Sequence, residues 1–395
     1  MCFTENRNGK LVGVVSYNIH SIHLNYGAVL HTYAFQQYLK KNGVDSVILN
    51  YKPTGHLEHY SLMFPIFNYK GGGRRKLYEH LRSWGFGFWA NVRKYIKFQR
   101  FFRKHYVKTK RQYTFEQLMK MDELEDLNVA VWVCESDVIW KLYKKKSFDD
   151  IFFLNAPFMQ NCRKVAYAPS MGARKLSDEE AARFRSLTAP FNAISLREKE
   201  SADYVSSLLG RDVSFVLDPV FLLGIDDYDK ILLPPKERHY LLVYACIKDD
   251  KKMISEARKL ADRLGLQVIE ISTFDYHRFK FGHIVRSDAS VEEFLGYFKY
   301  ADFVVSNSFH GICFSIIFQK QFFVFQRDKT DYRMQSLIRE MDCNDRLVLC
   351  DDKHIPENFS DIDFCRVEAK RVKLLRESTI YIQNNIINVI QSDAD

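Results

Sequence analysis

The chain alternates short apolar runs with longer stretches whose apolar residues recur every three or four positions. In the first half the short runs predict strands at residues 11–16, 46–51, 129–133, 164–168, 192–196 and 214–217. Residues 28–41 have helical spacing, with Val29, Leu30, Tyr33 and Ala34 on one face. Continuous apolar strands that alternate with helices are typical of parallel sheets covered by helices.

The second half repeats this pattern. It predicts strands at 240–246, 266–272, 302–306 and 322–325, and helices at 250–264 and 365–391. Ser177 and Glu180 have the spacing of a capping box, which predicts the start of another helix. The sequence therefore predicts an α/β protein.

A chain of 395 residues is too long for one hydrophobic core. The segment Leu232–Pro235, with two prolines before a charged run, is the predicted joint between two domains. We expect an N-terminal Rossmann-like domain at 1–232, a C-terminal one at 233–365, and a C-terminal helix at 366–395 that crosses back. The two domains are expected to face each other across a cleft.

The net charge of +9 is unevenly distributed. Residues 70–111 carry fourteen Lys or Arg and one acid, a local +13, so the remainder of the chain has 9 − 13 = −4. This basic segment is expected to be a helical insertion in the N-terminal domain. One basic segment in a mildly acidic chain does not favour nucleic-acid binding, because nothing else resembles a recognition module.

Part of this segment, Phe88–Val107, has the pattern of an amphipathic helix. Its apolar stripe comprises Phe88, Val92, Tyr95, Ile96, Phe102 and Tyr106, and its basic face comprises Arg93, Lys94, Lys97, Arg100 and Lys104. Such a helix can lie on an anionic membrane surface, or its aromatic stripe can pack on the first domain. The sequence leaves both interpretations open.

Apolar runs of membrane-spanning length are absent from the sequence, and the charged N-terminus does not resemble a signal peptide. The eight cysteines form no CxxC pair, and those in apolar runs, such as Cys246 and Cys313, are expected to be buried and reduced. We therefore expect a cytoplasmic protein. The pairs His20/His23 and His56/His59 lack a recognisable third ligand, so we expect no metal.

Polar residues follow the predicted strands of the first half, where ligands bind in open α/β sheets. Asn25 and Gly27 precede the first helix and form either an anion site or an ordinary capped turn. Glu135 and Asp137 follow strand 129–133, as a base and its neighbour or as helix caps. Arg197 can hold an anion bidentately, or it pairs with Glu198 or another acid.

The segment at 301–311 carries the most information about chemistry. A buried strand ends in small polar residues, and Ser308, His310 and Gly311 then open an almost wholly apolar helix. A titratable imidazole beside unpaired helix amides forms a compact anion site. A structural histidine is the alternative.

Six segments occur in the order seen in the polysaccharide pyruvyl transferase family, which this sequence resembles over residues 11–325. They are Asn25–Ala34, Ser136–Trp140, Ala166–Gly172, Ser195–Glu198, Leu217–Pro219 and Ser308–Gly311. The resemblance implies a GT-B-like fold and transfer of the enolpyruvyl carbons of phosphoenolpyruvate onto a sugar diol as a cyclic ketal. The acceptor of such an enzyme is often a lipid-linked repeat unit.

The resemblance and the chemistry together assign roles. His310 is the candidate acid or phosphate ligand, Arg197 the anion clamp, and Asp137 the base or hydroxyl-orienting group. The candidate substrate-binding residues are Asn25, Gly27, Ser136, Ser170, Glu198, Ser308 and Gly311. Cationic side chains can supply the charge stabilisation, so no cofactor is expected beyond the donor substrate.

Three positions depart from the family pattern. The family usually has Gly at the position of Glu135, commonly Asp at that of Asn307, and usually Gln at that of His31. These three changes bear on the acceptor preference. Two other functions remain open: a nucleotide-sugar glycosyltransferase, with Glu270 as its ribose-binding carboxylate, and a non-catalytic partner in a polysaccharide assembly complex.

Overall fold

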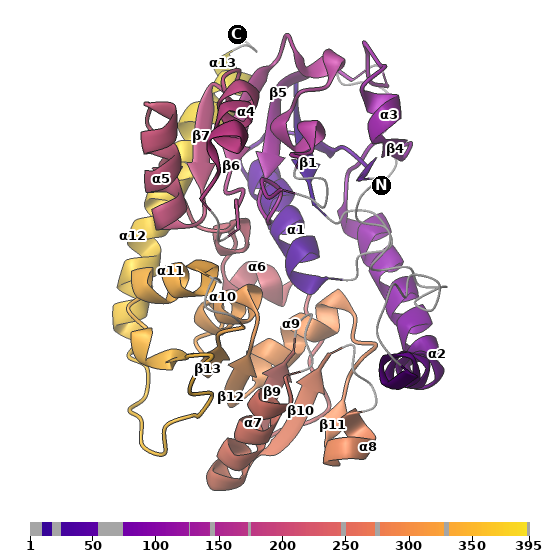
Figure 1. Cartoon of the computed structure of the whole chain (residues 1–395), viewed down its shortest axis with the longest axis vertical. Coiled ribbons are helices and arrows are strands. Elements are labelled where there is room, and N and C mark those ends of the chain that lie inside the picture. The colour runs from indigo at the N-terminus through magenta and orange to yellow at the C-terminus, as the bar shows by residue number, and fades with distance from the viewer. Residues whose placement is uncertain are drawn as a thin grey trace. The chain divides into compact units, whose positions relative to one another are not determined.

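The computed structural model describes residues 10–17, 25–53, 74–125, 127–142, 147–172, 175–245, 250–272, 277–327 and 332–392 (Figure 1). Contacts within the chain divide it into two compact units. The first unit comprises residues 1–57, 102–223 and 371–395, and the second comprises 58–101 and 224–370. Each unit is described by itself.

The first unit is built on a six-stranded parallel sheet with the order β2-β1-β5-β6-β7-β8. Its strands are β1 Leu11–Ser16, β2 Ser46–Ile48, β5 Val129–Glu135, β6 Arg163–Tyr167, β7 Ala193–Leu196 and β8 Ser214–Phe215. Gly13 lies opposite Trp132 in this sheet, and a Cβ at Gly13 would come within 2.4 Å of the indole ring. The missing side chain makes room for a large aromatic residue on the neighbouring strand.

Helices α1 Tyr26–Lys41, α4 Asp178–Thr188 and α5 Lys199–Leu209 connect these strands. The capping box at Ser177 and Glu180 forms as predicted, with both reciprocal hydrogen bonds present. A second, two-stranded parallel sheet pairs β3 Tyr51–Lys52 with β4 Tyr113–Thr114, which leads into α3 Phe115–Leu118. The predicted strand 46–51 is therefore broken, because Tyr51 pairs with Tyr113 instead of continuing β2.

The second unit has its own six-stranded parallel sheet, with the order β11-β10-β9-β12-β13-β14. Its strands are β9 Tyr240–Tyr244, β10 Gln267–Ile271, β11 Ile284–Val285, β12 Phe303–Ser306, β13 Gln321–Phe325 and β14 Leu347–Val348. Its helices include α6 Ile225–Asp229, α7 Lys251–Leu264, α8 His277–Phe281, α9 Val291–Tyr300, α10 Phe309–Ile317 and α11 Tyr332–Glu340.

The C-terminal segment begins in the second unit and ends in the first. It consists of α12 Phe364–Ile382, a π-helical turn Gln383–Ile387 and α13 Asn388–Ser392. Within the first unit, the Tyr381 hydroxyl donates to the Ala166 carbonyl at 2.9 Å, and the Leu217 amide donates to Ser378 Oγ at 2.8 Å. The expected helix that crosses back is present.

Helix α2 Arg74–His105 carries most of the basic segment. Arg93 Nε lies 2.6 Å from Asp288 Oδ2, and Lys97 Nζ lies 2.8 Å from Glu293 Oε2. Residues 58–101 accordingly group with the second unit, whereas we expected all of 70–111 in the N-terminal domain. The units also divide at 223/224 and 370/371, rather than at 232/233 and 365/366.

The faces of α2 differ from the predicted faces. Lys94, predicted on the basic face, is buried, and its ammonium lies 5.5 Å from the centre of the Phe98 ring. Ile96, predicted on the apolar stripe, is 48% exposed. The buried stripe instead contains Ala90, Lys94, Phe98, Phe101 and Phe102. Lysine can occupy such a stripe because its four methylene groups pack as apolar surface. The predicted Phe88 lies outside the side chains that the structure describes.

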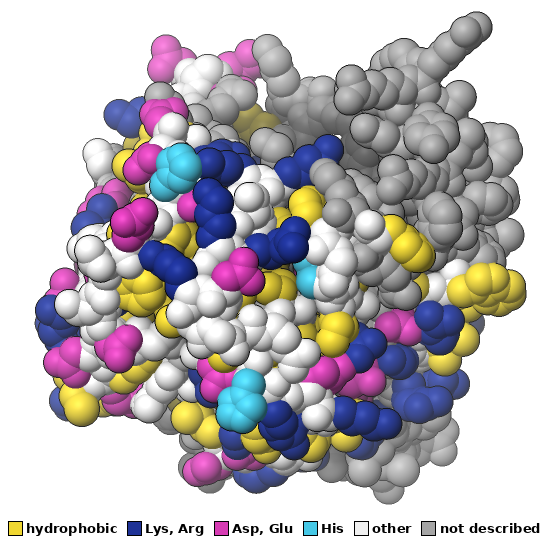
Figure 2. Space-filling view, turned by 90° about the horizontal axis from the view of Figure 1, so that it is seen from below, with side chains coloured by type: hydrophobic (Ala, Val, Ile, Leu, Met, Phe, Trp, Pro, Cys, Tyr) yellow, Lys and Arg dark blue, Asp and Glu magenta, His cyan; other side chains and the backbone are white. Residues whose placement is uncertain are grey.

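Charges of both signs are interspersed on the described part of one face of the molecule (Figure 2). In the described part of the face shown in Figure 2, Lys and Arg lie among Asp and Glu instead of forming a patch of one sign. Ion pairs along α7 are of this mixed kind, since Glu256 lies 2.9 Å from Lys259 Nζ and 3.7 Å from Lys252 Nζ. This pattern agrees with the small net charge outside the basic segment.

The predicted fold class is confirmed: the protein is α/β, with two Rossmann-like parallel sheets covered by helices (Figure 1). Cys134 and Cys313, which lie in apolar runs, are buried as expected, and Cys343 is also buried. Cys246 and the histidine pairs His20/His23 and His56/His59 lie outside the described residues. The expected cleft between domains concerns their relative placement and stays a prediction.

Candidate functional site

The turn after β5 brings together several of the predicted residues. Ser136 and Asp137 both have positive φ angles, of 47° and 58°. Two successive non-glycine residues in this region are uncommon, and such strain is concentrated at functional sites. Ser170 fixes the turn from both sides, because its amide donates to the Asp137 carbonyl at 2.8 Å and its carbonyl accepts from the Trp140 amide at 3.2 Å.

Arg197, which follows β7, is surrounded by carboxylates. Its Nη1 donates to Asp218 Oδ2 at 2.6 Å, its Nη2 lies 3.5 Å from Asp137 Oδ1, and its Nε lies 3.5 Å from Glu198 Oε1. Burial lowers the pKa of Arg197, but these three negative charges outweigh it and raise the pKa above its usual value. The guanidinium is buried, which favours the ion-pair interpretation over the anion clamp.

Ser136 joins the same group. Its hydroxyl donates to Asp218 Oδ2 at 2.9 Å and lies 3.3 Å from Arg197 Nη1. The other oxygen of Asp218 accepts from the Val220 amide at 3.2 Å, as the cap of a short 3₁₀ turn. Asp218 is thus held in place by a backbone amide, a hydroxyl and a guanidinium.

A second buried ion pair lies beside the first. His31 Nδ1 is 2.7 Å from Glu135 Oε1, and His31 Nε2 is 3.9 Å from Asp137 Oδ2. Burial alone lowers the pKa of His31, but the charge of Glu135 and hydrogen bonds to Asp137 and Glu135 outweigh it and raise the pKa to about 10. His31 is therefore an imidazolium at neutral pH.

The second oxygen of Glu135 accepts two hydroxyl hydrogen bonds. Ser16 Oγ donates to Oε2 at 2.7 Å and Thr32 Oγ1 donates at 3.2 Å. Ser16 ends β1, Thr32 lies on α1 and Glu135 ends β5, so three elements converge on one carboxylate. A buried charge is tolerated when it is paired and hydrogen-bonded in this way.

These residues form one network, which we call the strand-end network: Ser16, His31, Thr32, Glu135, Ser136, Asp137, Arg197, Glu198 and Asp218. Its four carboxyl groups outnumber its two cations, so it is suited to accept hydrogen bonds from hydroxyl groups and not to bind an anion. Asp137 is 13% exposed, whereas the charged side chains paired with it are at most 1% exposed. The network therefore reaches the surface at Asp137.

Asn25 and Gly27 form the capped turn that the sequence offered as one interpretation. Asn25 is the N-cap of α1, and its Oδ1 accepts from the amides of Gly27 at 3.0 Å and Ala28 at 3.4 Å. His31 follows on the same helix. The cap therefore fixes the start of the helix that carries one cation of the network.

The second unit holds the other predicted residues where β12 meets α10. Ser308 is the N-cap of α10, and its amide donates to Ser306 Oγ at 3.1 Å. A Cβ at Gly311 would come within 2.2 Å of the same Ser306 Oγ. Glycine is required here because the strand end and the first turn of the helix approach so closely.

His310 lies in that first turn. It is 7% exposed, and its ring meets the Phe309 ring edge to face at a centroid distance of 5.4 Å. Asn307 is also buried at this point. An imidazole at a helix start, next to amides that point along the helix axis, is an arrangement that binds phosphate or carboxylate groups.

A further buried cluster surrounds Glu270 at the end of β10. Its Oε1 is 2.8 Å from His277 Nδ1, its Oε2 is 2.7 Å from His283 Nε2, and Ser272 Oγ donates to Oε1. Burial alone raises the pKa of Glu270, but the hydrogen bonds from both histidines outweigh it and lower the pKa. Both oxygens are engaged by the protein, so Glu270 is poorly suited to hold a ribose.

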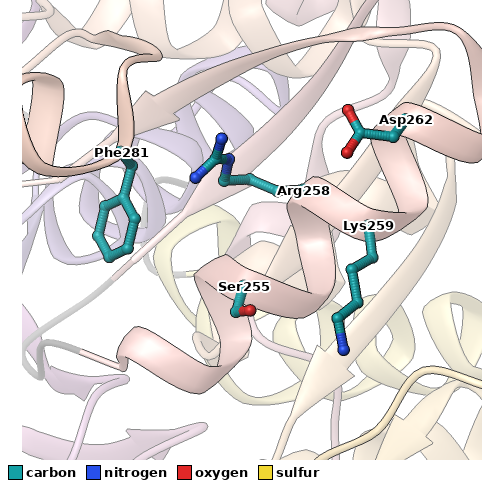
Figure 3. A pocket seen from close by; sticks show the side chains of 5 residues that line it. All are labelled: Ser255, Arg258, Lys259, Asp262 and Phe281. Atoms are coloured by element: carbon teal, nitrogen blue, oxygen red, sulfur yellow. The ribbon is translucent and has the colours of Figure 1, made fainter.

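A hollow of about 190 Å³ lies on the outer side of α7. Figure 3 shows Arg258 extending toward Phe281 while Lys259 points away from it; the hollow is lined by Ser255, Arg258, Lys259, Asp262 and Phe281. None of these side chains is a predicted site residue.

In the part of the chain that the structure describes, no group of three or more His, Cys, Asp or Glu could hold a metal ion. No helix among the described residues is both long and apolar enough to cross a membrane. The expectation that the protein needs no metal stays a prediction.

A family model for polysaccharide pyruvyl transferases matches residues 25–329, well over half of the chain. The chain belongs to this family. The match includes every residue of the strand-end network except Ser16, and it includes the start of α10. Among curated proteins, no relative matches this pyruvyl transferase family member.

Several solved structures resemble it at low sequence identity. Staphylococcus aureus MnaA, solved with UDP, is 11% identical with a TM-score of 0.45, over 95% of this chain and 91% of that one. The UDP-GlcNAc 2-epimerase of Neisseria meningitidis is 10% identical with a TM-score of 0.44, over 98% of both chains. The N-terminal domain of Candida albicans trehalose-6-phosphate phosphatase is 9% identical with a TM-score of 0.47, over 99% of this chain and 97% of that one. Likenesses of this size carry no functional argument.

The sequence identified some members of the network and missed others. Ser136, Asp137, Arg197 and Glu198 were predicted as site residues and lie together, with Ser170 holding their turn. Glu135 was considered as a base or its neighbour, as a helix cap and as a departure from the family, but it was not among the predicted site residues. Asp218 was noted only as part of a motif, and His31 only as a departure from the family. The signal that pointed to Glu135, an acidic residue after an apolar strand, could also have identified Asp218, which follows the predicted strand 214–217.

Proposed function

We propose that this protein transfers the enolpyruvyl group of phosphoenolpyruvate to a sugar of a polysaccharide repeat unit, forms a cyclic pyruvate ketal and releases phosphate. Membership of the pyruvyl transferase family over residues 25–329 is the observation that carries the proposal. Two features support it: an acidic network that reaches the surface at Asp137, and an imidazole at the start of α10.

The donor fits the start of α10. Phosphoenolpyruvate carries a phosphate and a carboxylate, and the helix amides with His310 offer positive electrostatic potential. In the proposed reaction His310 gives a proton to the methylene carbon, and C2 develops the positive charge of an oxocarbenium ion. Arg197 lies among carboxylates, so we assign the donor anion to the second unit and give Arg197 the role of holding Asp137 and Asp218.

The acceptor fits the strand-end network. Asp137 accepts a hydrogen bond, and then the proton, from the sugar hydroxyl that attacks C2. Phosphate then leaves C2 with the electrons of its C–O bond, and a second hydroxyl of the same sugar adds to C2 and loses its proton, which closes the ketal ring. Ser136, Ser170 and Glu198 hold the turn and the arginine beside Asp137.

Phosphate release tests the proposal. The purified protein is incubated with phosphoenolpyruvate and, in separate reactions, methyl glycosides of glucose, galactose and mannose or lipid-linked oligosaccharides. We expect phosphate release that depends on the acceptor, and a product heavier than the acceptor by the mass of a pyruvate ketal. Release of phosphate without a ketal product, or no release with any acceptor, contradicts the proposed reaction.

A thermal shift separates this function from nucleotide-sugar transfer. A ligand at a hundred times its dissociation constant adds about 2.7 kcal/mol of apparent stability. We expect phosphoenolpyruvate to raise the melting temperature and UDP-sugars to leave it unchanged. This expectation is supported by Glu270, the carboxylate that a nucleotide-sugar enzyme would need, because both of its oxygens already pair with histidines. Stabilisation by a UDP-sugar alone favours the glycosyltransferase.

We further propose a cytoplasmic enzyme that contacts an anionic membrane through α2 when its acceptor is lipid-linked. The exposed stripe of α2 supports this proposal: Trp89 is 69% exposed and Ile96 48% exposed, and arginines lie between and beyond them. Tryptophan and arginine on one helix face suit the boundary between lipid headgroups and acyl chains. The phosphoenolpyruvate donor and the sugar acceptor need no nucleic acid, metal or further cofactor.

A further inference from the structure

Two of the three departures from the family pattern contact each other. His31 lies on α1 and Glu135 ends β5, 104 positions apart, yet their side chains are 2.7 Å apart and both are fully buried. With the family residues, Gln at position 31 and Gly at position 135, this pair of positions would carry no charge. If only one of the two positions departed from the family, the His or the Glu there would lack the other as its partner. Breaking a buried ion pair by removing one partner costs about 3–5 kcal/mol, so the two departures are complementary.

The pair is directed at Asp137. The nitrogen of His31 that Glu135 does not contact lies 3.9 Å from Asp137 Oδ2, and Arg197 Nη2 lies 3.5 Å from Asp137 Oδ1. Each oxygen of Asp137 thus faces a buried cation. Each cation is itself held by a second carboxylate, His31 by Glu135 and Arg197 by Asp218.

We infer that His31 and Glu135 are positioning residues that orient the Asp137 carboxylate toward the acceptor sugar and so set acceptor specificity. The inference rests on the proposed function and deepens it. Asp137 is the point where the network is exposed, so a change in the cation on one side of it alters which hydroxyl geometry it can accept. The donor end, at His310, belongs to the other unit.

The charge of His31 gives a readout that needs no substrate. The groups that face it are Glu135 and Asp137 at the end of β5 and Asp218 before the 3₁₀ turn, while Tyr106, after α2, lies close enough to sense Glu135. Because the folded pKa of His31 is raised to about 10 from 6.5, its stabilisation is full below pH 6.5 and is lost as pH rises toward 10. The equilibrium constant for unfolding should increase up to tenfold for each pH unit in that window.

The first experiment compares wild type with the double variant His31→Gln/Glu135→Gln, which removes both charges with little change in size. Urea unfolding is measured from pH 6 to 10, with His354→Gln as the control because that histidine is exposed. We expect the unfolding equilibrium constant to increase with pH in wild type and in the control, and to lose this increase in the double variant. If it increases equally with pH in all three proteins, the charged ion pair is contradicted.

The second experiment measures kinetics in a double-mutant cycle of Glu135→Gln with Asp137→Asn. We expect Glu135→Gln to raise the KM for the methyl glycoside at least tenfold and that for phosphoenolpyruvate less than twofold. In the Asp137→Asn background, Glu135→Gln should have no further effect on the acceptor KM, because His31 and Glu135 act through Asp137. Additive effects, or a change confined to the donor KM, contradict the inference.

Failure of the proposed function looks different from failure of this inference. If wild type releases no phosphate with any acceptor, the donor or the reaction is wrong. The unfolding data still decide whether the pair is charged, and binding of methyl glycosides to wild type and Glu135→Gln, measured by calorimetry, then replaces the kinetics. Equal affinity in both proteins overturns the positioning role.

Discussion

The two residues with the most direct predicted roles have different environments. Arg197 is buried among three carboxylates, so its charge compensates theirs. His310 lies in the first turn of α10 beside an aromatic ring, in the other unit. Substitution of these two residues should therefore have different consequences.

Arg197→Ala should unfold or strongly destabilise the protein. Its removal leaves Asp218 and Glu198 as buried charges without this cation, which costs about 3–5 kcal/mol for a buried pair. Chemical denaturation measures the loss, and Arg211→Ala is a control arginine in the same unit, since its guanidinium bonds to backbone carbonyls. If Arg197→Ala has normal stability and has lost only activity, the interpretation of Arg197 as an anion clamp is favoured instead.

His310→Ala should keep its fold and lose activity. Removal of a general acid lowers the rate by 10²–10⁴-fold, so we expect turnover to fall at least a hundredfold in the phosphate-release assay. The melting temperature should stay close to that of wild type, as in the exposed control His354→Ala. Turnover near wild type removes His310 from the mechanism, and loss of folding indicates a structural histidine.

Helix α2 shows how an element can keep its predicted type while its faces change. The sequence predicts the helix correctly, but in the structure the buried stripe contains Lys94 and the exposed one contains Ile96. The exposed residues Trp89, Arg93, Ile96, Arg100 and Arg103 recur at intervals of three and four, so they lie on one side of the helix. Two of the predicted membrane cations, Arg93 and Lys97, are paired with acids of the second unit.

The membrane contact is therefore best tested on this exposed stripe. Changing Trp89 to Ala, and Arg100 and Arg103 to Gln, should abolish pelleting with vesicles rich in anionic lipid and spare activity on a soluble methyl glycoside. Each Lys or Arg near an anionic surface contributes roughly 1 kcal/mol, and salt at 1 M should weaken binding. Lys251, Arg258 and Lys259 on α7, changed to Gln, are the matched control. Equal pelleting of both variants contradicts the proposal.

At the scale of the whole molecule, the chain returns to its first unit at the end. Tyr381, Ile382, Ile386 and Ile387 are buried there, and the Tyr381 hydroxyl bonds to the carbonyl of Ala166 in β6. The first unit is thus assembled from three separate segments of the chain, the last of which begins at residue 371.

Tyr381→Ala should consequently destabilise the first unit. Removing a buried aromatic side chain costs about 3–5 kcal/mol, and the Tyr381→Phe variant, which loses only the hydroxyl, should cost about 1 kcal/mol. Urea unfolding of both proteins tests this order. A loss in Tyr381→Ala no greater than in Tyr381→Phe would mean that the C-terminal helix is not part of the core.

The sequence alone determined the elements and much of the chemistry. Strand 11–16, the start of a helix at Ser177 and the end of another at Gly265 follow from apolar spacing and caps, which depend on residues only a few positions apart. Polar residues after apolar strands pointed to Ser136, Asp137 and Arg197, because parallel strands end at the same edge of a sheet.

Only the tertiary structure decided which charges meet. The order β1-β5-β6-β7 places Glu135 and Asp137 at the end of β5 and Arg197 at the end of β7, on either side of β6, and α1 brings His31 to Glu135 across 104 positions. The same applies to α2, where Arg93 and Lys97 pair with Asp288 and Glu293, which lie 195 and 196 positions away in the sequence. Ion-pair partners and helix faces depend on distances in space, which local periodicity does not encode.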